Sequence, residues 1–161
     1  MTARFSAGLL PFRRSGDGLE VFLVHMSGPY WAHKDDGAWS IAKGEYDPAI
    51  EQPEAVARRE FAEEVGRPAP SGECRDAGEF RMPSGKRVRV FAVETDDDLS
   101  FVSSNLFTME WPPRSGRMQE FPETDAAAWF DLETAQVKLV SGQVPVLAAL
   151  AKAVDGLGRP G

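Results

Sequence analysis

Apolar residues in the first half of the chain form short runs whose spacing is that of β-strands. Residues 5–13 are rich in apolar side chains and predict one strand. Residues 19–25 read Leu-Glu-Val-Phe-Leu-Val-His and predict a second strand that is mostly buried. Residues 39–42 predict a short strand that ends at Lys43 and Gly44. Further strands are expected at 77–81, 87–94, 105–110 and 127–130, with a hairpin turn at 83–86.

Two segments have the composition and the boundaries of helices. Pro53 suits the first helical position, residues 55–65 are rich in helix formers, and Gly66 ends the helix. Residues 144–154 predict an amphipathic helix near the C-terminus, and Asp131 is suited to cap a short helix before it. Because strands dominate the middle of the chain, we expect an α/β fold with a mixed sheet packed between helices.

The overall composition indicates one globular domain, residues 1–161. Of the 161 residues, 42% are hydrophobic and 27% are charged, a mixture typical of folded proteins. The formal net charge of −7 argues against general binding to duplex DNA or to anionic membranes, since both depend on clustered Lys and Arg. The net charge does not exclude a local basic patch that binds a small phosphorylated ligand.

The scarcity of cysteine and histidine limits the chemistry. Cys74 is the only cysteine, which excludes an internal disulfide and a zinc site of the finger type. His25 and His33 are the only histidines, so a His-rich zinc centre is excluded as well. No run approaches the roughly 20 apolar residues that span a bilayer, and the N-terminal residues lack the core of a signal peptide. We therefore expect a cytoplasmic protein.

Three glutamates of the central helix fall on one arc. At about 100° per residue, Glu60, Glu63 and Glu64 span roughly 100° beside an apolar stripe that holds Phe61 and Val65. Like charges at this spacing repel each other, and a divalent cation removes the repulsion. Mg²⁺ takes oxygen ligands from carboxylates, water and phosphate, so the arc is suited to hold Mg²⁺ against a substrate phosphate. A solvated acidic face without a function is the alternative.

The sequence around this arc resembles the Nudix box. That motif reads Gly, five residues, Glu, seven residues, then Arg-Glu-aliphatic-x-Glu-Glu-x-Gly-aliphatic, and residues 44–67 follow it. The matching residues are Gly44, Glu51, Arg59, Glu60, Phe61, Glu63, Glu64 and Gly66. The chain departs from the motif in three places. Six residues separate Gly44 from Glu51, Arg67 stands where an aliphatic residue is usual, and Ala42 stands where many members have proline.

The resemblance implies a fold, a metal ion and a set of roles. The fold would be an α/β/α sandwich. Glu60 and Glu64 would be direct ligands of Mg²⁺, with Mn²⁺ as the alternative ion, and Glu63 would bind a second ion or act through water. The backbone carbonyl of Gly44 would complete the metal site. Arg59 would pair with the carboxylates and orient them.

A general base in this family often comes from a glutamate in a late loop, and the chain offers Glu120 and Glu123. Glu123 lies six residues before Trp129, a spacing that resembles the diadenosine tetraphosphate hydrolase branch of the family. We therefore favour Glu123 as the base. The alternative is that both glutamates are solvated loop acids.

Two polar segments, 27–37 and 111–122, are expected to be long loops that supply substrate contacts. Positive side chains in these loops or beside the box are suited to clamp a polyphosphate: Lys34, Lys43, Arg114 and Arg117. Aromatic side chains there are suited to stack on a nucleobase: Tyr30, Trp31 and Trp111. Plain surface charge or packing is the alternative for each, and we expect Trp39 and Trp129 in the core or at its rim.

The resemblance thus implies a metal-dependent hydrolase of phosphoanhydride bonds in nucleoside diphosphates linked to another moiety. The Trp-Ser-Ile-x-Lys-Gly segment at 39–44 and the Glu123 to Trp129 spacing favour dinucleoside polyphosphates such as diadenosine tetraphosphate. Two alternatives stay open: a MutT-like pyrophosphohydrolase of nucleoside triphosphates, and a nucleotide-binding regulator without catalysis. The expected partner is a small nucleotide, with neither duplex nucleic acid nor membrane, and the oligomeric state is left open.

Overall fold

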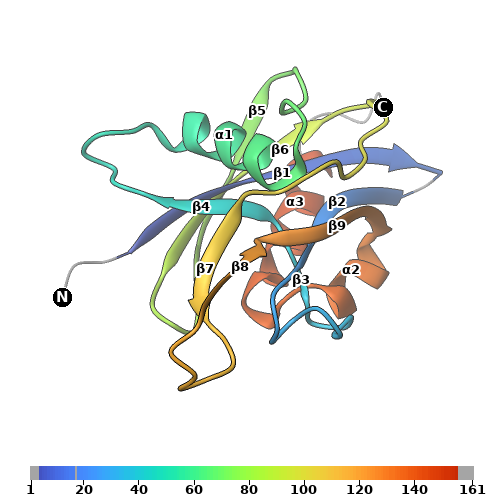
Figure 1. The fold of residues 1–161 in the computed structure, drawn as a ribbon. Coiled ribbons are helices and arrows are strands. Elements are labelled where there is room, and N and C mark those ends of the chain that lie inside the picture. The colour runs from blue at the N-terminus through green and yellow to red at the C-terminus, as the bar shows by residue number, and fades with distance from the viewer. Residues whose placement is uncertain (1–3, 17, 156–161) are drawn as a thin grey trace.

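The fold is a mixed β-sheet with helices on both faces and a separate two-stranded hairpin (Figure 1). The structure is a computed structural model, and it describes residues 4–16 and 18–155. The large sheet contains β1 (Phe5–Ser15), β2 (Gly18–Met26), β3 (Trp39–Ser40), β4 (Ala42–Tyr46), β5 (Cys74–Arg81), β6 (Arg87–Glu94) and β9 (Thr124–Asp131). The hairpin consists of β7 (Leu106–Glu110) and β8 (Met118–Pro122). The helices are α1 (Pro53–Val65), α2 (Leu132–Lys138), the 3₁₀ helix η1 (Ser141–Gln143) and α3 (Pro145–Asp155).

Strand β1 organises the sheet because it pairs with three other strands. It pairs in parallel with β6, and antiparallel with β4 through its first half and with β2 through its second half. Strand β2 also pairs with β3 and β9, and β6 pairs with β5, all antiparallel. The predicted mixed sheet is therefore confirmed.

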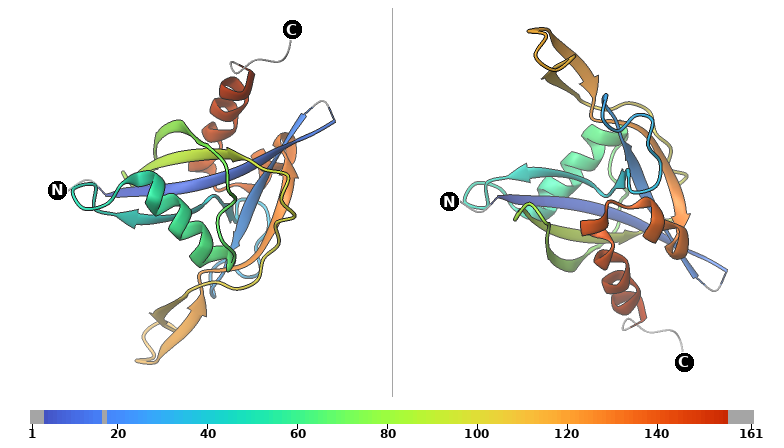
Figure 2. Two further views of the ribbon diagram at one scale, coloured as in Figure 1. Left: turned by 90° about the horizontal axis from the view of Figure 1, so that it is seen from above. Right: turned by 90° about the horizontal axis from the view of Figure 1, so that it is seen from below.

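Alternate residues of the central strands enter two separate hydrophobic cores. In β2, Val21 and Leu23 pack in the core that α2 and α3 cover, whereas Phe22 and Val24 pack in the core that α1 covers. Strands buried on both faces read as nearly continuous apolar runs, as β1 and β2 do. Figure 2 shows α1 on one side of the sheet and α3 on the other. The predicted α/β class and the α/β/α sandwich are confirmed.

Most predicted elements are confirmed, with bounds that shift by a few residues. Helix α1 begins at Pro53 and ends at Val65, and the capping residue Gly66 adopts a left-handed conformation (φ 81°) that favours glycine. Asp131 caps α2 by accepting a hydrogen bond from the Thr134 N–H at 2.7 Å. One prediction is wrong: residues 111–122 are not a loop throughout, because β8 pairs with β7. The segment Met-Gln-Glu-Phe-Pro alternates only weakly between apolar and polar residues and ends in proline, so its sequence pattern did not indicate a strand.

The predicted strand at 39–42 is broken at Ile41. Ser40 pairs with β2 and Ala42 pairs with β1, so the chain changes its partner strand between them. The Ile41 N–H donates instead to the side-chain oxygen of Gln143 at 2.8 Å. The amide nitrogen of Gln143 donates to the Ser40 hydroxyl at 2.9 Å. Gln143 is only 2% exposed, so its side chain is the buried partner that satisfies the Ile41 N–H where the strand pairing is interrupted between β3 and β4.

The β7–β8 hairpin projects from the body of the protein (Figures 1 and 2), and its described residues belong to neither core. Within the described residues, no helix has both the length and the apolar character needed to cross a membrane. The predicted domain of 1–161 includes residues 1–3, 17 and 156–161, which lie outside the described part of the chain.

Replacing Gln143 with Leu should lower the free energy of unfolding by about 1–3 kcal/mol, because the Ile41 N–H would stay buried without a partner. Urea denaturation followed by circular dichroism measures the change. Gln119 offers a matched control, since its exposed side chain donates to the Trp111 carbonyl at the surface. Gln119→Leu should change stability by less than about 0.5 kcal/mol. Equal losses in the two variants would contradict the role of Gln143 at the break.

Candidate functional site

A cavity of about 490 Å³ lies beside the C-terminal half of α1. Its walls come from β1, β2, β3, β4 and β9, the turn before β6, the β7–β8 hairpin and the loop after β2. The lining residues are Ser6, Val24, Met26, Ser27, Trp31, Ser40, Lys43, Gly44, Glu45, Glu60, Glu64, Lys86, Phe107, Glu123 and Thr124. Carboxylates, lysine ammonium groups and aromatic rings therefore share one concave site, a combination suited to a charged ligand that also has an apolar part.

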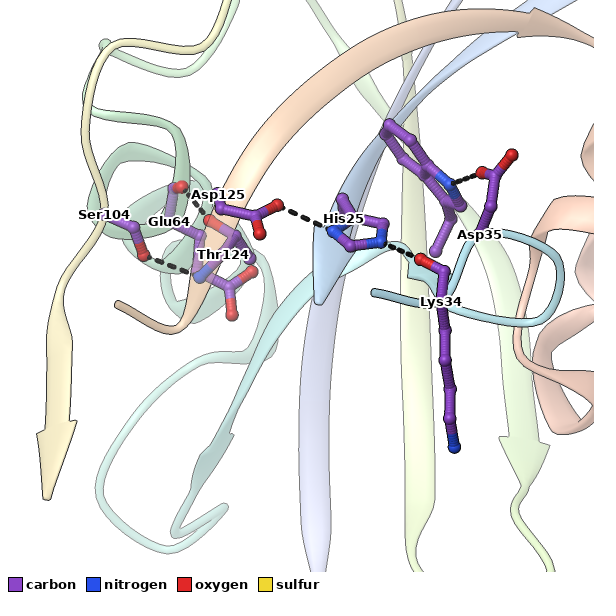
Figure 3. Close-up of polar contacts among 8 residues, drawn as sticks. His25, Lys34, Asp35, Glu64, Ser104, Thr124 and Asp125 are labelled. Atoms are coloured by element: carbon purple, nitrogen blue, oxygen red, sulfur yellow. Dashed lines mark hydrogen bonds and ion pairs between the residues drawn. The ribbon is translucent and has the colours of Figure 1, made fainter. Parts of the chain in front are cut away.

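Glu64 is the buried acidic residue of this cavity, at 8% exposed. Its Oε2 accepts a hydrogen bond from the backbone N–H of Lys43 at 3.1 Å. Its backbone carbonyl accepts a hydrogen bond from the Thr124 hydroxyl at 2.5 Å (Figure 3). Glu64 thereby ties the last turn of α1 to β4 on one side and to the first residue of β9 on the other.

The electrostatics of the cavity favour a bound cation. The pKa of Glu64 is raised from 4.5 to about 8, chiefly by burial. The Lys43 ammonium opposes this shift, whereas the charges of Glu123 and Glu60 add to it. The pKa of Glu60 is raised by burial first and then by repulsion from Glu63 and Glu123. The protein surroundings therefore do not compensate a negative charge on Glu64, which keeps its proton at neutral pH unless a cation binds.

Gly44 lies in direct contact with the carboxylate of Glu60. A Cβ atom at residue 44 would overlap the carboxylate carbon and both oxygens of Glu60. Glycine is therefore the residue that leaves the Glu60 carboxylate in its place. The extra residue before Glu51 does not disturb this approach, because it is accommodated in the turn after β4. There the Asp47 carbonyl accepts the Glu51 N–H at 3.0 Å.

Arg59 contacts three carboxylates. Its guanidinium pairs with Glu51 before the helix and lies 3.7 Å from Glu60 and 3.9 Å from Glu63. The structure does not bring Glu63 into the cavity lining, because its side chain lies beside Arg59 and is 36% exposed. Of the predicted carboxylate trio, Glu60 and Glu64 meet in the cavity and Glu63 lies outside it.

A chain of backbone hydrogen bonds fixes the position of Glu123 relative to α1. The Asn105 N–H donates to the Glu63 carbonyl at 3.0 Å, and the Asn105 carbonyl accepts the Glu123 N–H at 2.8 Å. The Glu123 carbonyl in turn accepts the Ser27 N–H at 3.2 Å. Glu123 is therefore held at the junction of three segments, although its side chain is exposed.

The structure separates the two candidates for the general base. Glu123 lines the cavity, and its charge raises the pKa of both Glu60 and Glu64. Glu120 instead lies opposite Thr108 in the hairpin, where it is exposed and does not line the cavity. Only Glu123 of this pair is brought to the carboxylates.

The donors in the cavity fit a hard divalent cation that is bound in part by water and by the ligand. Among the described residues, no three side chains of His, Cys, Asp or Glu meet closely enough to enclose a metal ion. Mg²⁺ needs no such enclosure, because it usually keeps several waters and binds one or two carboxylates together with substrate phosphates. Glu60 and Glu64 supply such carboxylates beside the backbone of Gly44.

His25 links the loop after β2 to the start of β9 (Figure 3). Its Nδ1 lies 2.7 Å from the Asp125 carboxylate, and its Nε2 lies 2.5 Å from the Lys34 carbonyl. Both ring nitrogens therefore have an acceptor within hydrogen-bond distance. This clamp holds the loop that carries Trp31 against the strand that follows Glu123.

Lys43 and Trp31 are the predicted substrate-binding residues that line the cavity. Lys34 does not line the cavity, but its Nζ lies 5.2 Å from the centre of the Trp31 ring, in a cation–π contact. Trp39 and Trp129 pack against the two hydrophobic cores, as expected.

The other predicted substrate contacts lie away from the cavity lining. Tyr30 is 55% exposed and packs edge-on against Trp111, with ring centres 5.2 Å apart. Arg114 and Arg117 are exposed in the turn that joins β7 to β8. These residues lie in the turn of the projecting hairpin or pack against it, and not at the carboxylates.

Sequence reasoning missed several residues of the cavity, and Lys86 and Phe107 are two of them. Lys86 belongs to the turn before β6, where the sequence indicated a hairpin and no chemistry. Phe107 belongs to β7, and its ring packs so closely on Gly28 that a Cβ there would lie 3.0 Å from it. Both residues are far from the box in sequence, so only the folded chain brings them to the site.

A comparison with protein families agrees with this geometry. The family model described as NUDIX domain matches residues 2–150. That range includes the box at 44–67 and every strand of the large sheet. No curated protein matches the chain.

Solved structures show the same fold at low sequence identity. The NUDIX domain of Shewanella oneidensis NrtR, complexed with ADP ribose, has a TM-score of 0.64 and 12% identity, covering 96% of this chain and 90% of its own. A C. elegans Ap4A hydrolase in a binary complex has a TM-score of 0.63 and 19% identity, covering 94% and 99%. The E. coli ORF135 protein has a TM-score of 0.54 and 23% identity, covering 98% and 95%.

The stability of the metal-free protein should fall as the pH rises from about 5 to 8. Glu64 keeps its proton in the folded protein up to a pKa of about 8, whereas in the unfolded chain it loses the proton near 4.5. Between these values the folded state binds one more proton, so the free energy of unfolding falls by up to about 1.4 kcal/mol per pH unit. Urea denaturation in EDTA at several pH values measures this slope.

Two comparisons make this pH test specific. Glu64→Gln should flatten the slope, because an amide cannot titrate, and a saturating divalent cation should flatten it in the parent protein. The same slope in Glu64→Gln as in the parent would show that the stability change comes from other groups.

Gly44→Ala should weaken divalent-cation binding by about tenfold or more while the protein stays folded. The added methyl group displaces the Glu60 carboxylate, the flexible end of a side chain, rather than the backbone. Mn²⁺ titration followed by electron paramagnetic resonance measures the affinity. Gly18→Ala is the control, since a Cβ at residue 18 would meet only the Ser15 carbonyl, at 3.9 Å. Unchanged Mn²⁺ affinity in Gly44→Ala would count against this metal site.

Proposed function

Because this chain belongs to the Nudix family, whose hydrolases act on pyrophosphate bonds with a divalent metal ion, we propose that it is a Mg²⁺-dependent hydrolase of nucleoside diphosphates linked to another moiety. Dinucleoside polyphosphates such as diadenosine tetraphosphate are the favoured substrates. One observation carries the proposal: Glu60, Glu64 and Glu123 share a single cavity with Lys43 and the ring of Trp31. Carboxylates for a cation, an ammonium group for phosphate and an aromatic face for a base are the groups that such a substrate requires.

Glu60 and Glu64, with the backbone carbonyl of Gly44, would hold the divalent ion. When bound, the ion supplies charge stabilisation to the phosphoryl oxygens and acidifies water at neutral pH. Glu123 lines the same cavity and takes the proton of the attacking water. Arg59 touches no substrate in this scheme. It is a positioning residue that keeps the Glu60 carboxylate in place through the contacts described above.

Lys43 binds phosphate oxygens, and Trp31 stacks on one nucleobase of the substrate. Water then adds to one phosphorus while the bond from that phosphorus to the bridging oxygen breaks. Diadenosine tetraphosphate would yield ATP and AMP. The residues at 39–44 and the spacing from Glu123 to Trp129 support this substrate class, as does the shared fold with the C. elegans Ap4A hydrolase.

Two other functions are the alternatives to this proposal. A MutT-like pyrophosphohydrolase would use the same carboxylates on nucleoside triphosphates and release pyrophosphate. A nucleotide-binding regulator is favoured by the similar fold of the NrtR domain, which was solved with ADP ribose. Against a regulator, the chain keeps all three glutamates of the box, Glu60, Glu63 and Glu64. The cytoplasmic location and the single domain of 1–161 stay predictions.

The product pattern tests the proposed function. Purified protein with Mg²⁺ should convert diadenosine tetraphosphate to ATP plus AMP, identified by ion-exchange chromatography, and Glu60→Gln should remove that activity. Turnover of nucleoside triphosphates alone, with release of pyrophosphate, would establish the MutT-like alternative. Nucleotide binding without turnover in the parent protein would establish the regulator.

Glu123→Gln should lower kcat by about 10²–10⁴-fold, because the amide cannot take the proton of the attacking water. The matched control is Glu120→Gln, since Glu120 lies three residues earlier and is exposed on the hairpin. The control should keep kcat within about twofold of the parent. A larger loss in Glu120→Gln than in Glu123→Gln would reverse the assignment of the base.

A further inference from the structure

His25 is a buried polar side chain that the proposed reaction does not use. It lies near the end of β2 and is 7% exposed. Its ring stands between the Asp125 carboxylate and the Lys34 carbonyl, which belong to segments far apart in the sequence (Figure 3). The same ring packs against Trp39 in a T-shaped contact, with ring centres 5.0 Å apart. A side chain with a partner at each ring nitrogen joins the two segments rather than simply filling space.

The Asp125 end of this clamp is a fixed point of the fold. The residue before it, Thr124, is tied to α1, because its hydroxyl donates to the Glu64 carbonyl at 2.5 Å. The register of β2 and β9 shifts between His25 and Met26, which leaves Asp125 as an extra residue in β9, as in a β-bulge. Bulges redirect side chains, and here the carboxylate of the extra residue reaches the His25 ring.

The other end of the clamp is connected to Trp31 by two contacts of Lys34. The Lys34 N–H donates to the Trp31 carbonyl at 2.9 Å, and the Lys34 Nζ lies over the Trp31 ring. His25 faces the carbonyl of this same lysine at 2.5 Å. The His25 ring therefore determines where Lys34, and with it Trp31, lies relative to β9. Trp31 in turn lines the cavity that contains the carboxylates.

The two ends of the loop that carries Trp31 are held by backbone bonds that do not involve the clamp. The Ser27 N–H donates to the Glu123 carbonyl at 3.2 Å, and the Gly37 N–H donates to the Val137 carbonyl at 3.0 Å. Loss of the clamp should therefore leave the loop attached at both ends and loosen the position of Trp31 between them. Replacement of the histidine thus tests the position of one ring in a folded protein.

We propose that His25 is a positioning residue that holds Trp31 in place relative to the Glu60 and Glu64 carboxylates and so strengthens binding of the substrate's nucleobase. This inference rests on the proposed function, in which Trp31 stacks on a base. A ring that is already held in its binding position spares the ligand the entropy cost of ordering it. His25 itself is not among the residues that line the cavity, so a ligand without a base should not sense its loss.

Calorimetric titration of ADP and of inorganic pyrophosphate, each with Mg²⁺, tests this role without turnover. His25→Ala should lower ADP affinity by about tenfold, because the stacking ring is no longer held, and should keep pyrophosphate affinity within about twofold. His33→Ala is the matched control, since His33 is exposed in the same loop, and it should change neither affinity. Unchanged ADP affinity in His25→Ala, or equal losses for the two ligands, would overturn the proposal.

Two amide variants separate the bond to the Lys34 carbonyl from the packing of the ring. The side-chain nitrogen in His25→Gln can take the place of Nε2 and donate to that carbonyl, whereas the shorter side chain in His25→Asn reaches only the position of Nδ1. His25→Gln should therefore restore most of the ADP affinity that His25→Ala loses, and His25→Asn should not. Equal ADP affinities in the two amide variants would contradict a role through Lys34.

Steady-state kinetics distinguishes a failure of this inference from a failure of the proposed function. In hydrolysis of diadenosine tetraphosphate, His25→Ala should raise KM by about tenfold and keep kcat within about threefold. A loss confined to kcat would overturn the role of His25 and leave the proposed reaction standing. Absence of hydrolysis in the parent protein, together with a selective loss of ADP affinity in His25→Ala, would overturn the reaction and leave the role of His25 standing.

Discussion

The buried carboxylate of Glu64 is the constraint on which the rest of the site depends. A carboxylate removed from water favours its neutral form unless donors or cations compensate the lost hydration. The fold supplies one backbone N–H and one ammonium group, both from Lys43, and then sets Glu60 and Glu123 close by. In the metal-free protein Glu64 therefore keeps its proton up to a pKa of about 8. A pKa shifted this far by burial and neighbouring charges is characteristic of functional sites, and a bound cation would favour the charged form again.

The last turn of α1 is where the fold brings this cluster together. The Val65 carbonyl accepts the N–H groups of Val102 and Ser103, and the Asn105 N–H reaches the carbonyl of Glu63. These bonds guide the chain from β6 past the helix end and into the β7–β8 hairpin. The two carboxylates proposed to bind the metal ion thus stand on α1, which packs in one of the two cores, whereas the hairpin belongs to neither. Because the carboxylates and the hairpin stand on separate elements, residues of the hairpin can change, and substrate preference with them, without displacing the carboxylates.

The sequence predicted the central helix, the residues at which it begins and ends, and the burial of the strand at 19–25, because local pattern governs those features. It did not predict that Glu63 would lie outside the cavity, since spacing on a helix defines an arc and not the neighbours of each side chain. It also missed Lys86 and Phe107, which reach the site through the sheet order and the hairpin. Arg67, unusual at its position in the box, bonds the Asp98 carbonyl and the Ser100 hydroxyl, contacts that only the folded chain reveals.

The central claim is that one divalent ion binds between Glu60 and Glu64. The most direct test is a crystal structure of the protein soaked with Mn²⁺, in which anomalous scattering locates the ion. We expect a peak about 2.1 Å from carboxylate oxygens of both residues, beside the backbone of Gly44. An ion bound at Glu63 and Arg59 outside the cavity, or no ion near Glu64 at saturating Mn²⁺, would contradict this account.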